Sequence, residues 1–105
     1  MLYIGTDIIL RMKSSRTNGN VFLDLGFPEE EAQNLALRSD LMVRIQKLVQ
    51  ESKSTQQEAA KLFGISQPRL NALLKGKIAA FSLDSLVNML ARAGMQVKMT
   101  IKKAA

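Results

Sequence analysis

The side chains best suited to molecular recognition in this sequence lie close together, between Gln67 and Lys77. Gln67, Arg69 and Asn71 carry amide and guanidinium groups, which can make paired hydrogen bonds to the edges of bases. Lys75 and Lys77 follow directly, and Lys53 precedes them, as cations suited to phosphate. This combination predicts a nucleic-acid surface, with base reading by the first three residues and phosphate binding by the lysines.

Two short helices joined by a tight turn are expected to position these groups. Thr55 followed three residues later by Glu58 is a capping box that begins the first helix, and Gly64 is suited to end it. Ser66 can cap a second helix with Pro68 in its first turn. The pattern predicts that the outward residues are Gln67, Arg69, Asn71 and Lys75, and that the core residues are Leu62, Phe63, Ile65, Leu70 and Leu73.

The flanking segments predict further helices and one strand. Apolar spacings of three and four predict helix from Glu29 to about Glu51, which a cap at Ser39 and Asp40 would divide in two. Residues 21–25 are expected to form a short strand or extended arm, and Ser82 to begin a helix that ends at Gly94. Residues 95–102 alternate apolar and polar side chains, which predicts a strand that pairs with residues 21–23, a second subunit or another protein.

Composition narrows the class of protein. The chain has 105 residues and a net charge of +6, which predicts one domain with a polyanionic partner. Between Lys53 and Lys77 only Glu58 opposes five cations, so the positive charge is concentrated on the two short helices. The absence of cysteine and histidine argues against the usual metal sites, disulfides and imidazole catalysis, so we expect no enzyme, no catalytic residues, no metal and no cofactor. Without a membrane-length apolar run or a signal-peptide pattern, a cytoplasmic protein with no membrane partner is expected.

The domain organisation follows from one composition change. A turn-prone run at residues 14–19 separates the first ten residues from the rest of the chain. We therefore predict a flexible N-terminal extension over residues 1–19, and a helix-turn-helix DNA-binding domain with a C-terminal strand over residues 20–105. The fold class is predicted to be mainly α, a bundle of about four to five helices with a short C-terminal β-strand. Because one such module covers only part of an operator, we expect a homodimer on double-stranded DNA with an inverted repeat.

The helix-turn-helix of the XRE/Cro/C1 repressor family is similar in its spacing to Gln56, Ala60, Gly64, Ile65, Leu70 and Leu73 of this chain. This resemblance implies a lambda-repressor-like helix-turn-helix bundle. Residues 20–31, Ser66 to Leu70, and Gly76 to Leu86 are also similar to the HigA-type antitoxin branch, so that the resemblance covers roughly residues 20 to 103. It implies that the chain neutralises a RelE/HigB-like ribonuclease toxin and represses its own operon.

The resemblance also adds three residues to the predicted DNA surface. It implies that Gln56 binds phosphate and braces Gln67, and that Ala72 occupies a base-reading position. Pro68 departs from the polar residue common at its position, which leaves it only apolar contact, for example with a thymine methyl group.

Two other functions remain open on the sequence. The first is a stand-alone, phage-like XRE-type repressor without a toxin partner. The second is a small basic ribonuclease, which fits the length and the charge, but the chain has no histidine and its single tyrosine is Tyr3, so no convincing acid–base pair is present.

Overall fold

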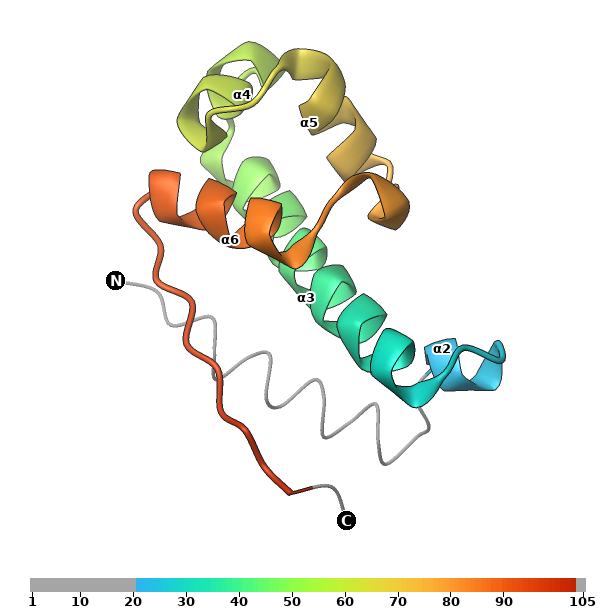
Figure 1. The fold of residues 1–105 in the computed structure, drawn as a ribbon. Helices are drawn as coiled ribbons and strands as arrows, with labels where there is room; N and C mark the ends of the chain where they lie inside the picture. The colour runs from blue at the N-terminus through green and yellow to red at the C-terminus, as the bar shows by residue number, and fades with distance from the viewer. Residues whose placement is uncertain (1–20, 104–105) are drawn as a thin grey trace.

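The computed structural model describes residues 21–103, and these residues form a mainly helical bundle (Figure 1). In chain order its elements are α2 (Val21–Asp24), α3 (Glu29–Ser52), α4 (Gln56–Phe63), α5 (Gln67–Leu74), the short 3-10 helix η1 (Ile78–Ala80) and α6 (Leu83–Arg92). The predicted fold class is confirmed. The predicted N-terminal extension lies outside the described residues.

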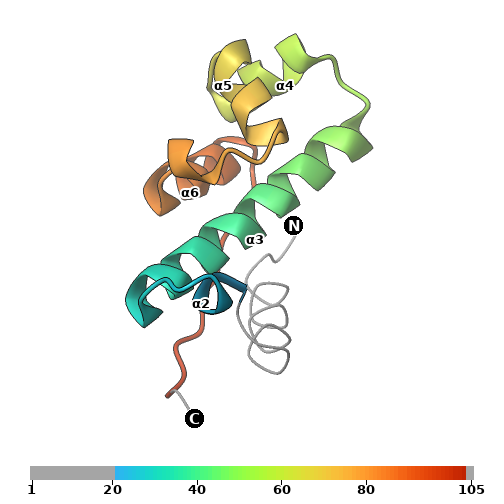
Figure 2. The same ribbon diagram turned by 90° about the vertical axis from the view of Figure 1, so that its right-hand side faces the viewer.

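The long helix α3 is the element against which the others are arranged. It packs against α2, α5, η1 and α6, while α4 contacts α5 and α6. Figures 1 and 2 show α2 at one end of α3, with α4 and α5 near the other end. None of the helices described between residues 21 and 103 is long and apolar enough to span a membrane.

The hydrophobic core lies between α3, α6 and the two short helices. Its central cluster takes one face of α3 and one face of α6, together with a single large side chain from each of α4, α5 and the loop before α6: Leu41, Met42, Ile45, Phe63, Leu73, Phe81, Leu86, Met89 and Leu90. Because these residues come from four helices, no pair of elements buries its apolar face alone. The α4–α5 pair is therefore held by the rest of the bundle.

Helix ends are defined by local hydrogen bonds that the sequence specifies. At the start of α4 the Thr55 hydroxyl accepts from the Glu58 N–H at 3.1 Å, and the Glu58 carboxylate accepts from the Thr55 N–H at 3.0 Å. This confirms the predicted capping box. At the end of α2, Phe27 N–H donates to Phe22 C=O and Gly26 N–H to Leu23 C=O, the paired bonds of a Schellman motif.

Two of the predictions for the N-terminal half were wrong. Residues 21–24 form the helical turn α2 instead of a strand, because Gly26 adopts a φ of +94° that closes the turn locally and satisfies its backbone groups without a partner strand. Helix α3 runs unbroken through Ser39 and Asp40. Leu35, Leu41 and Ile45 are all buried, so packing continues along one face and the helix is stable across a residue pair that would otherwise favour a cap.

The prediction of a C-terminal strand was also wrong. Within the described residues only Gln96 has bridge-type pairing, and residues 97–103 run away from α6 without regular structure (Figure 1). Met95 and Val97 pack against the core cluster, whereas Met99 and Ile101 are 55% and 96% exposed. In the first half of this segment, the alternation of apolar and polar side chains thus reflects packing against the bundle. No described segment provides the neighbouring strand that the second half would need.

One predicted core residue lies on the surface. Leu62 is 51% exposed, while Phe63 beside it is buried. On a helix of eight residues the face toward α5 and α6 takes Ala59, Ala60 and Phe63, which leaves Leu62 on the opposite side. Phe63, Leu70 and Leu73 are buried as predicted, and Ile65 is partly buried.

The loop between α5 and α6 is attached to α3 by Arg38. The Arg38 Nη1 donates to the carbonyls of Ile78 and Phe81, both at 3.2 Å, and its Nε donates to Asn34 Oδ1 at 2.7 Å. These bonds tie α3 to the carbonyl at the start of η1 and to the one just after its end. The planar guanidinium group can reach all three acceptors at once.

We expect Arg38→Lys to lower the free energy of unfolding by about 1–2 kcal/mol, because an ammonium group cannot hold both carbonyls and Asn34 together. Urea unfolding followed by circular dichroism measures the change. Asn34→Ala removes only the exposed acceptor, and as a matched control it should cost less than about 0.5 kcal/mol. Equal losses in the two variants would contradict a role for Arg38 in holding this loop.

The capping box also predicts a dependence of stability on pH. The backbone N–H and the hydroxyl of Thr55 both donate to the Glu58 carboxylate, which lowers the pKa of Glu58 below its ordinary value of 4.5. Its contribution to stability is therefore complete above the unfolded-state pKa and is lost as the pH falls through the lower, folded-state pKa.

We expect Glu58→Gln, which keeps an acceptor for the capping box, to make the melting temperature fall less between pH 5 and pH 3 than it does in the wild type. Thermal unfolding at a series of pH values measures this. An unchanged pH profile in the variant would show that Glu58 does not contribute to acid unfolding.

Candidate nucleic-acid interface

The helices α4 and α5 and their connecting turn form a helix-turn-helix. The Gly64 φ of +72° ends α4, with Gly64 N–H donating to Lys61 C=O at 3.2 Å and Ile65 N–H to Ala60 C=O at 2.9 Å. A Cβ on Gly64 would meet the Arg92 side chain of α6, with the Cδ at 2.6 Å and the Cζ at 2.8 Å. The turn therefore needs glycine for its backbone conformation, and it is also closely covered by α6.

The second helix, α5, has one buried face and one exposed face. Leu70 and Leu73 are completely buried. Four of the predicted base-reading residues are exposed, namely Gln67, Pro68, Arg69 and Asn71, and the fifth, Ala72, is partly buried against the core. The Ser66 hydroxyl accepts from the Arg69 N–H at 3.3 Å, which fixes the first turn that carries these side chains.

Arg69 makes a contact that the sequence did not suggest. Its guanidinium carbon lies 4.4 Å from the centroid of the Phe81 ring, within the range of a cation–π interaction. Phe81 itself is 1% exposed, so the guanidinium lies over an otherwise buried ring. Arg69 is thus oriented toward the side of α5 that faces the loop before α6, whereas no such contact restrains Gln67 within the described residues.

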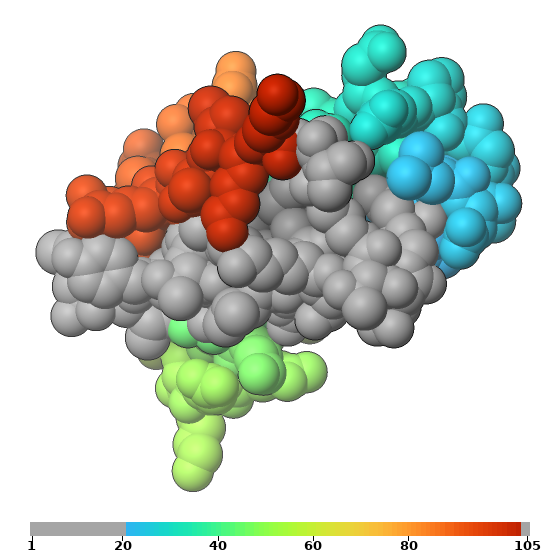
Figure 3. Space-filling model, turned by 90° about the horizontal axis from the view of Figure 1, so that it is seen from below, coloured from blue at the N-terminus to red at the C-terminus, as the bar shows by residue number. Residues whose placement is uncertain are grey.

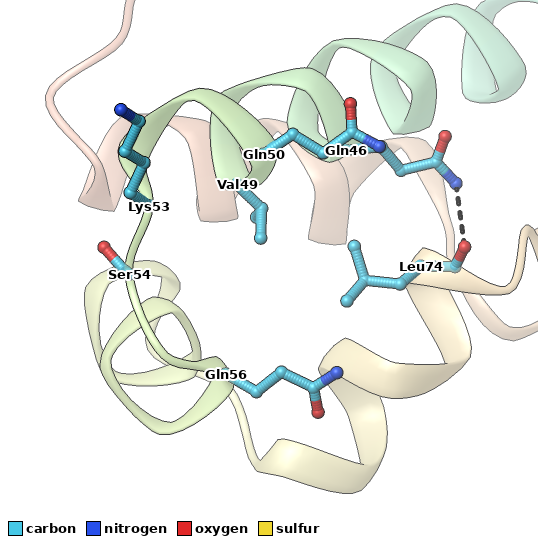
Figure 4. Close-up of a pocket in the computed structure, with 7 residues that line it drawn as sticks. All are labelled: Gln46, Val49, Gln50, Lys53, Ser54, Gln56 and Leu74. Atoms are coloured by element: carbon cyan, nitrogen blue, oxygen red, sulfur yellow. Dashed lines mark hydrogen bonds between the residues drawn. The ribbon is translucent and has the colours of Figure 1, made fainter.

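A groove of about 470 Å³ lies at the start of α4, between α3 and the end of α5 (Figure 4). Two of the predicted phosphate ligands, Lys53 and Gln56, line it together. The structure does not bring Lys75 and Lys77 into this groove, because they follow the end of α5. In Figure 4 the Gln56 side chain extends toward α5, and the Lys53 side chain points outward from the groove.

Lys53 holds a backbone conformation that is unusual for its residue type. It ends α3 with a φ of +55°, and it is the only residue other than glycine with a positive φ among residues 21–103. L-residues adopt this left-handed conformation at a cost of about 1–2 kcal/mol. The charged side chain of Lys53 therefore stands at a position where glycine would be less strained.

The groove also contains residues that sequence reasoning missed. Gln46 Nε2 donates to the carbonyls of Leu73 at 2.9 Å and Leu74 at 3.5 Å, so it joins α3 to the end of α5. Gln50 and Ser54 line the same groove. The signal was present as two glutamines four residues apart on α3, a spacing that places both side chains on one face.

The charges on this end of the bundle favour a polyanion. The segment from Lys53 to Lys77 carries five cations and one acid, and that acid, Glu58, is occupied by the capping box. An exposed helix face with amide and guanidinium groups, surrounded by cations, can combine base contacts with phosphate neutralisation. The arrangement needs no cofactor or metal for this chemistry.

The comparison with known protein families agrees with this geometry. A family model for a helix-turn-helix domain matches residues 21–102, which is most of the chain. No curated protein matches the chain. The matched range includes both helices of the motif, the long helix before them and the C-terminal segment. The chain therefore belongs to the family of helix-turn-helix domains.

Proposed function

We propose that this protein is a sequence-specific DNA-binding transcriptional regulator that binds an inverted repeat as a homodimer and acts without catalysis. The observation that carries the proposal is that α5 has one buried face and one exposed polar face. Leu70 and Leu73 are buried, whereas Gln67, Arg69 and Asn71 are exposed. A helix anchored in this way can enter the major groove with its polar face toward the bases.

We further propose that Gln67 and Arg69 make the principal base contacts. An amide such as Gln67 can donate and accept at adenine, and a guanidinium such as Arg69 can donate twice to guanine. Stacking on Phe81 supports the second assignment, because a restrained guanidinium loses less conformational entropy when it binds. Asn71 is proposed to read an adjacent base, and Pro68 and Ala72 offer only apolar contact.

Phosphate contacts are proposed at two places beside α5. Lys53 and Gln56 lie in the groove that Leu74, the last residue of α5, also lines, and Lys75 and Lys77 follow Leu74 in the chain. These contacts would fix the orientation of the reading helix on the duplex.

We also propose that the protein is an antitoxin, which neutralises a RelE/HigB-like toxin and represses the shared operon. Support comes from the similarity of its flanking segments to the HigA-type branch, including residues 20–31 and Gly76 to Leu86.

The proposed homodimer has separate support. Exposure of Met99 and Ile101 near the C-terminus agrees with an interface between two copies in this region.

A mobility-shift titration at fixed salt, with the promoter upstream of this gene and a scrambled duplex, tests DNA reading. We expect Gln67→Ala and Arg69→Met each to weaken promoter binding by about 1–3 kcal/mol, with little change on the scrambled duplex. Methionine keeps a long side chain over Phe81 but removes every hydrogen-bond donor. Lys61→Met, a cation removed from α4, is the matched control and should weaken binding to both duplexes equally.

Equal weak binding of the wild type to both duplexes would contradict sequence-specific regulation. Co-expression with a RelE/HigB-like toxin tests the antitoxin role through restored growth. Specific promoter binding without restored growth would instead support a stand-alone repressor.

A second prediction concerns the left-handed residue at the end of α3. We expect Lys53→Gly to raise the free energy of unfolding by about 1 kcal/mol, because glycine relieves the positive φ, while DNA binding becomes weaker through the lost cation. Urea unfolding and the same mobility-shift assay measure the two effects. Lys53→Ala should weaken DNA binding equally without the gain in stability, and failure of glycine to stabilise would contradict strain at this position.

A further inference from the structure

Arg69 stands at a helix position where local forces disfavour it. It is the third residue of α5, after the cap at Ser66. At the same position of α4 and α6, Glu58 and Ser85 accept from the backbone N–H of the capping residue and complete a capping box. A guanidinium group only donates hydrogen bonds, so Arg69 cannot make that bond, and its positive charge lies at the positive end of the helix dipole. The residue type at position 69 is therefore not explained by the helix that carries it.

The contact that Arg69 makes instead is with Phe81. The guanidinium carbon lies 4.4 Å from the centroid of the ring, and this cation–π contact offsets part of the cost of the helix position. Arg69 as a whole is exposed, so contact with the ring still leaves N–H groups accessible to DNA. The side chain thus combines an attachment inside the protein with free donors outside it.

Phe81 is held more firmly than an ordinary loop residue. Its N–H donates to the Ile78 carbonyl at 3.3 Å, and its own carbonyl accepts from Arg38 Nη1 at 3.2 Å. Phe81 directly precedes Ser82, the cap of α6, and Leu86 is the fourth residue of that helix, which are the positions of a hydrophobic staple. Phe81 and Leu86 are both buried in the central core cluster. The ring is thus a fixed point to which a long, flexible side chain can attach.

We propose that Phe81 is a positioning residue for DNA recognition. Its ring holds the guanidinium of Arg69 in place for a base, although Phe81 itself is buried and does not reach the DNA. This inference rests on the proposed function, because it requires that Arg69 reads a base. A side chain that is held before binding loses less conformational entropy in the complex. A guanidinium held by a packed neighbour also favours one base-pair position over the next, so the contact serves specificity as well as affinity.

The Arg69–Phe81 contact and the exposed C-terminal residues lie in different parts of the molecule. In Figure 1 the chain leaves α5, passes through η1 and continues into α6. Figure 3, which views the molecule from below, shows instead the C-terminal segment in red and α2 in blue. We therefore expect a substitution of Phe81 to change DNA recognition without changing the oligomeric state.

The test compares Phe81→Leu with Phe63→Leu in the purified full-length chain. Both rings are 1% exposed and belong to the central cluster, so the two variants lose similar packing, but of the two only Phe81 has Arg69 over it. Mobility-shift titrations at fixed salt use the promoter upstream of this gene and a scrambled duplex. We expect Phe81→Leu to weaken promoter binding about three- to tenfold, with little change on the scrambled duplex. Phe63→Leu should keep the wild-type ratio of the two affinities.

A double-mutant cycle shows whether Phe81 acts through Arg69. Arg69→Met removes the base contact, so adding Phe81→Leu to it should weaken promoter binding by less than about a further factor of two. All titrations are made well below the melting temperatures of the variants, which thermal unfolding provides, so that only folded proteins are compared.

Nuclear magnetic resonance observes the contact without DNA. The ring current of Phe81 should shift the Cδ proton resonances of Arg69 upfield in the wild type. The shift should be absent in Phe81→Leu and retained in Phe63→Leu, a difference that a loss of stability alone would not produce. Unshifted Arg69 resonances in the wild type would overturn the proposal.

The outcomes separate this inference from the proposed function. Equal affinity of the wild type for promoter and scrambled duplex overturns the proposed function, and the positioning role with it. Promoter-specific binding by the wild type, with the same loss from Phe81→Leu in the presence and absence of Arg69→Met, overturns the positioning role alone. Tighter promoter binding by Phe81→Leu also does so, because the ring would then withhold Arg69 from DNA. A changed oligomeric state of Phe81→Leu in size-exclusion chromatography overturns it as well.

Discussion

The close contact between α4 and α5 is the constraint on which the rest of this structure depends. Ala59, Ala60 and Leu70 form a separate small cluster at that contact, and two alanines allow the helices to approach where larger side chains would hold them apart. The Gly64 turn sets the direction in which the chain enters α5. Because Leu70 and Leu73 are then buried, Gln67, Arg69 and Asn71 lie on the exposed face of α5, and this polar face follows from the packing.

Helix α3 turns this small motif into a stable and oriented unit. Its side chains hold the neighbouring segments through their backbone carbonyls as well as through apolar packing, since Gln46 bonds to the end of α5 and Arg38 to both ends of η1. Such bonds link α3 to segments that lie 27 to 43 residues away in the chain. The same helix separates the cationic helix-turn-helix from the acids in α2 and in its own first turn.

Much of the fold could be predicted because its signals are local. Thr55 with Glu58, Ser66 with Pro68, and Gly64 act within a few residues, and all of them behave as their sequence pattern indicates. The errors arose where the outcome depends on distant contacts. The strand pattern after Met95 is a packing pattern, and the break expected at Ser39 is overridden by burial on both sides of it. The exposed polar face of α5 was foreseen, but the groove around Gln46 and Gln50 and the stacking of Arg69 were not, because each joins segments far apart in sequence.

Phe81 belongs to the hydrophobic core and also carries an exposed side chain of α5 on its ring. Its ring is buried among residues of the central cluster, and the guanidinium of Arg69 covers it from the side of α5. Any substitution of Arg69 therefore changes the cover of an aromatic ring as well as the exposed polar face of α5. Long or flat side chains such as glutamine, lysine or methionine preserve that cover, whereas serine or glycine would open the ring to water. The set of side chains that position 69 can carry is consequently limited by the hydrophobic core.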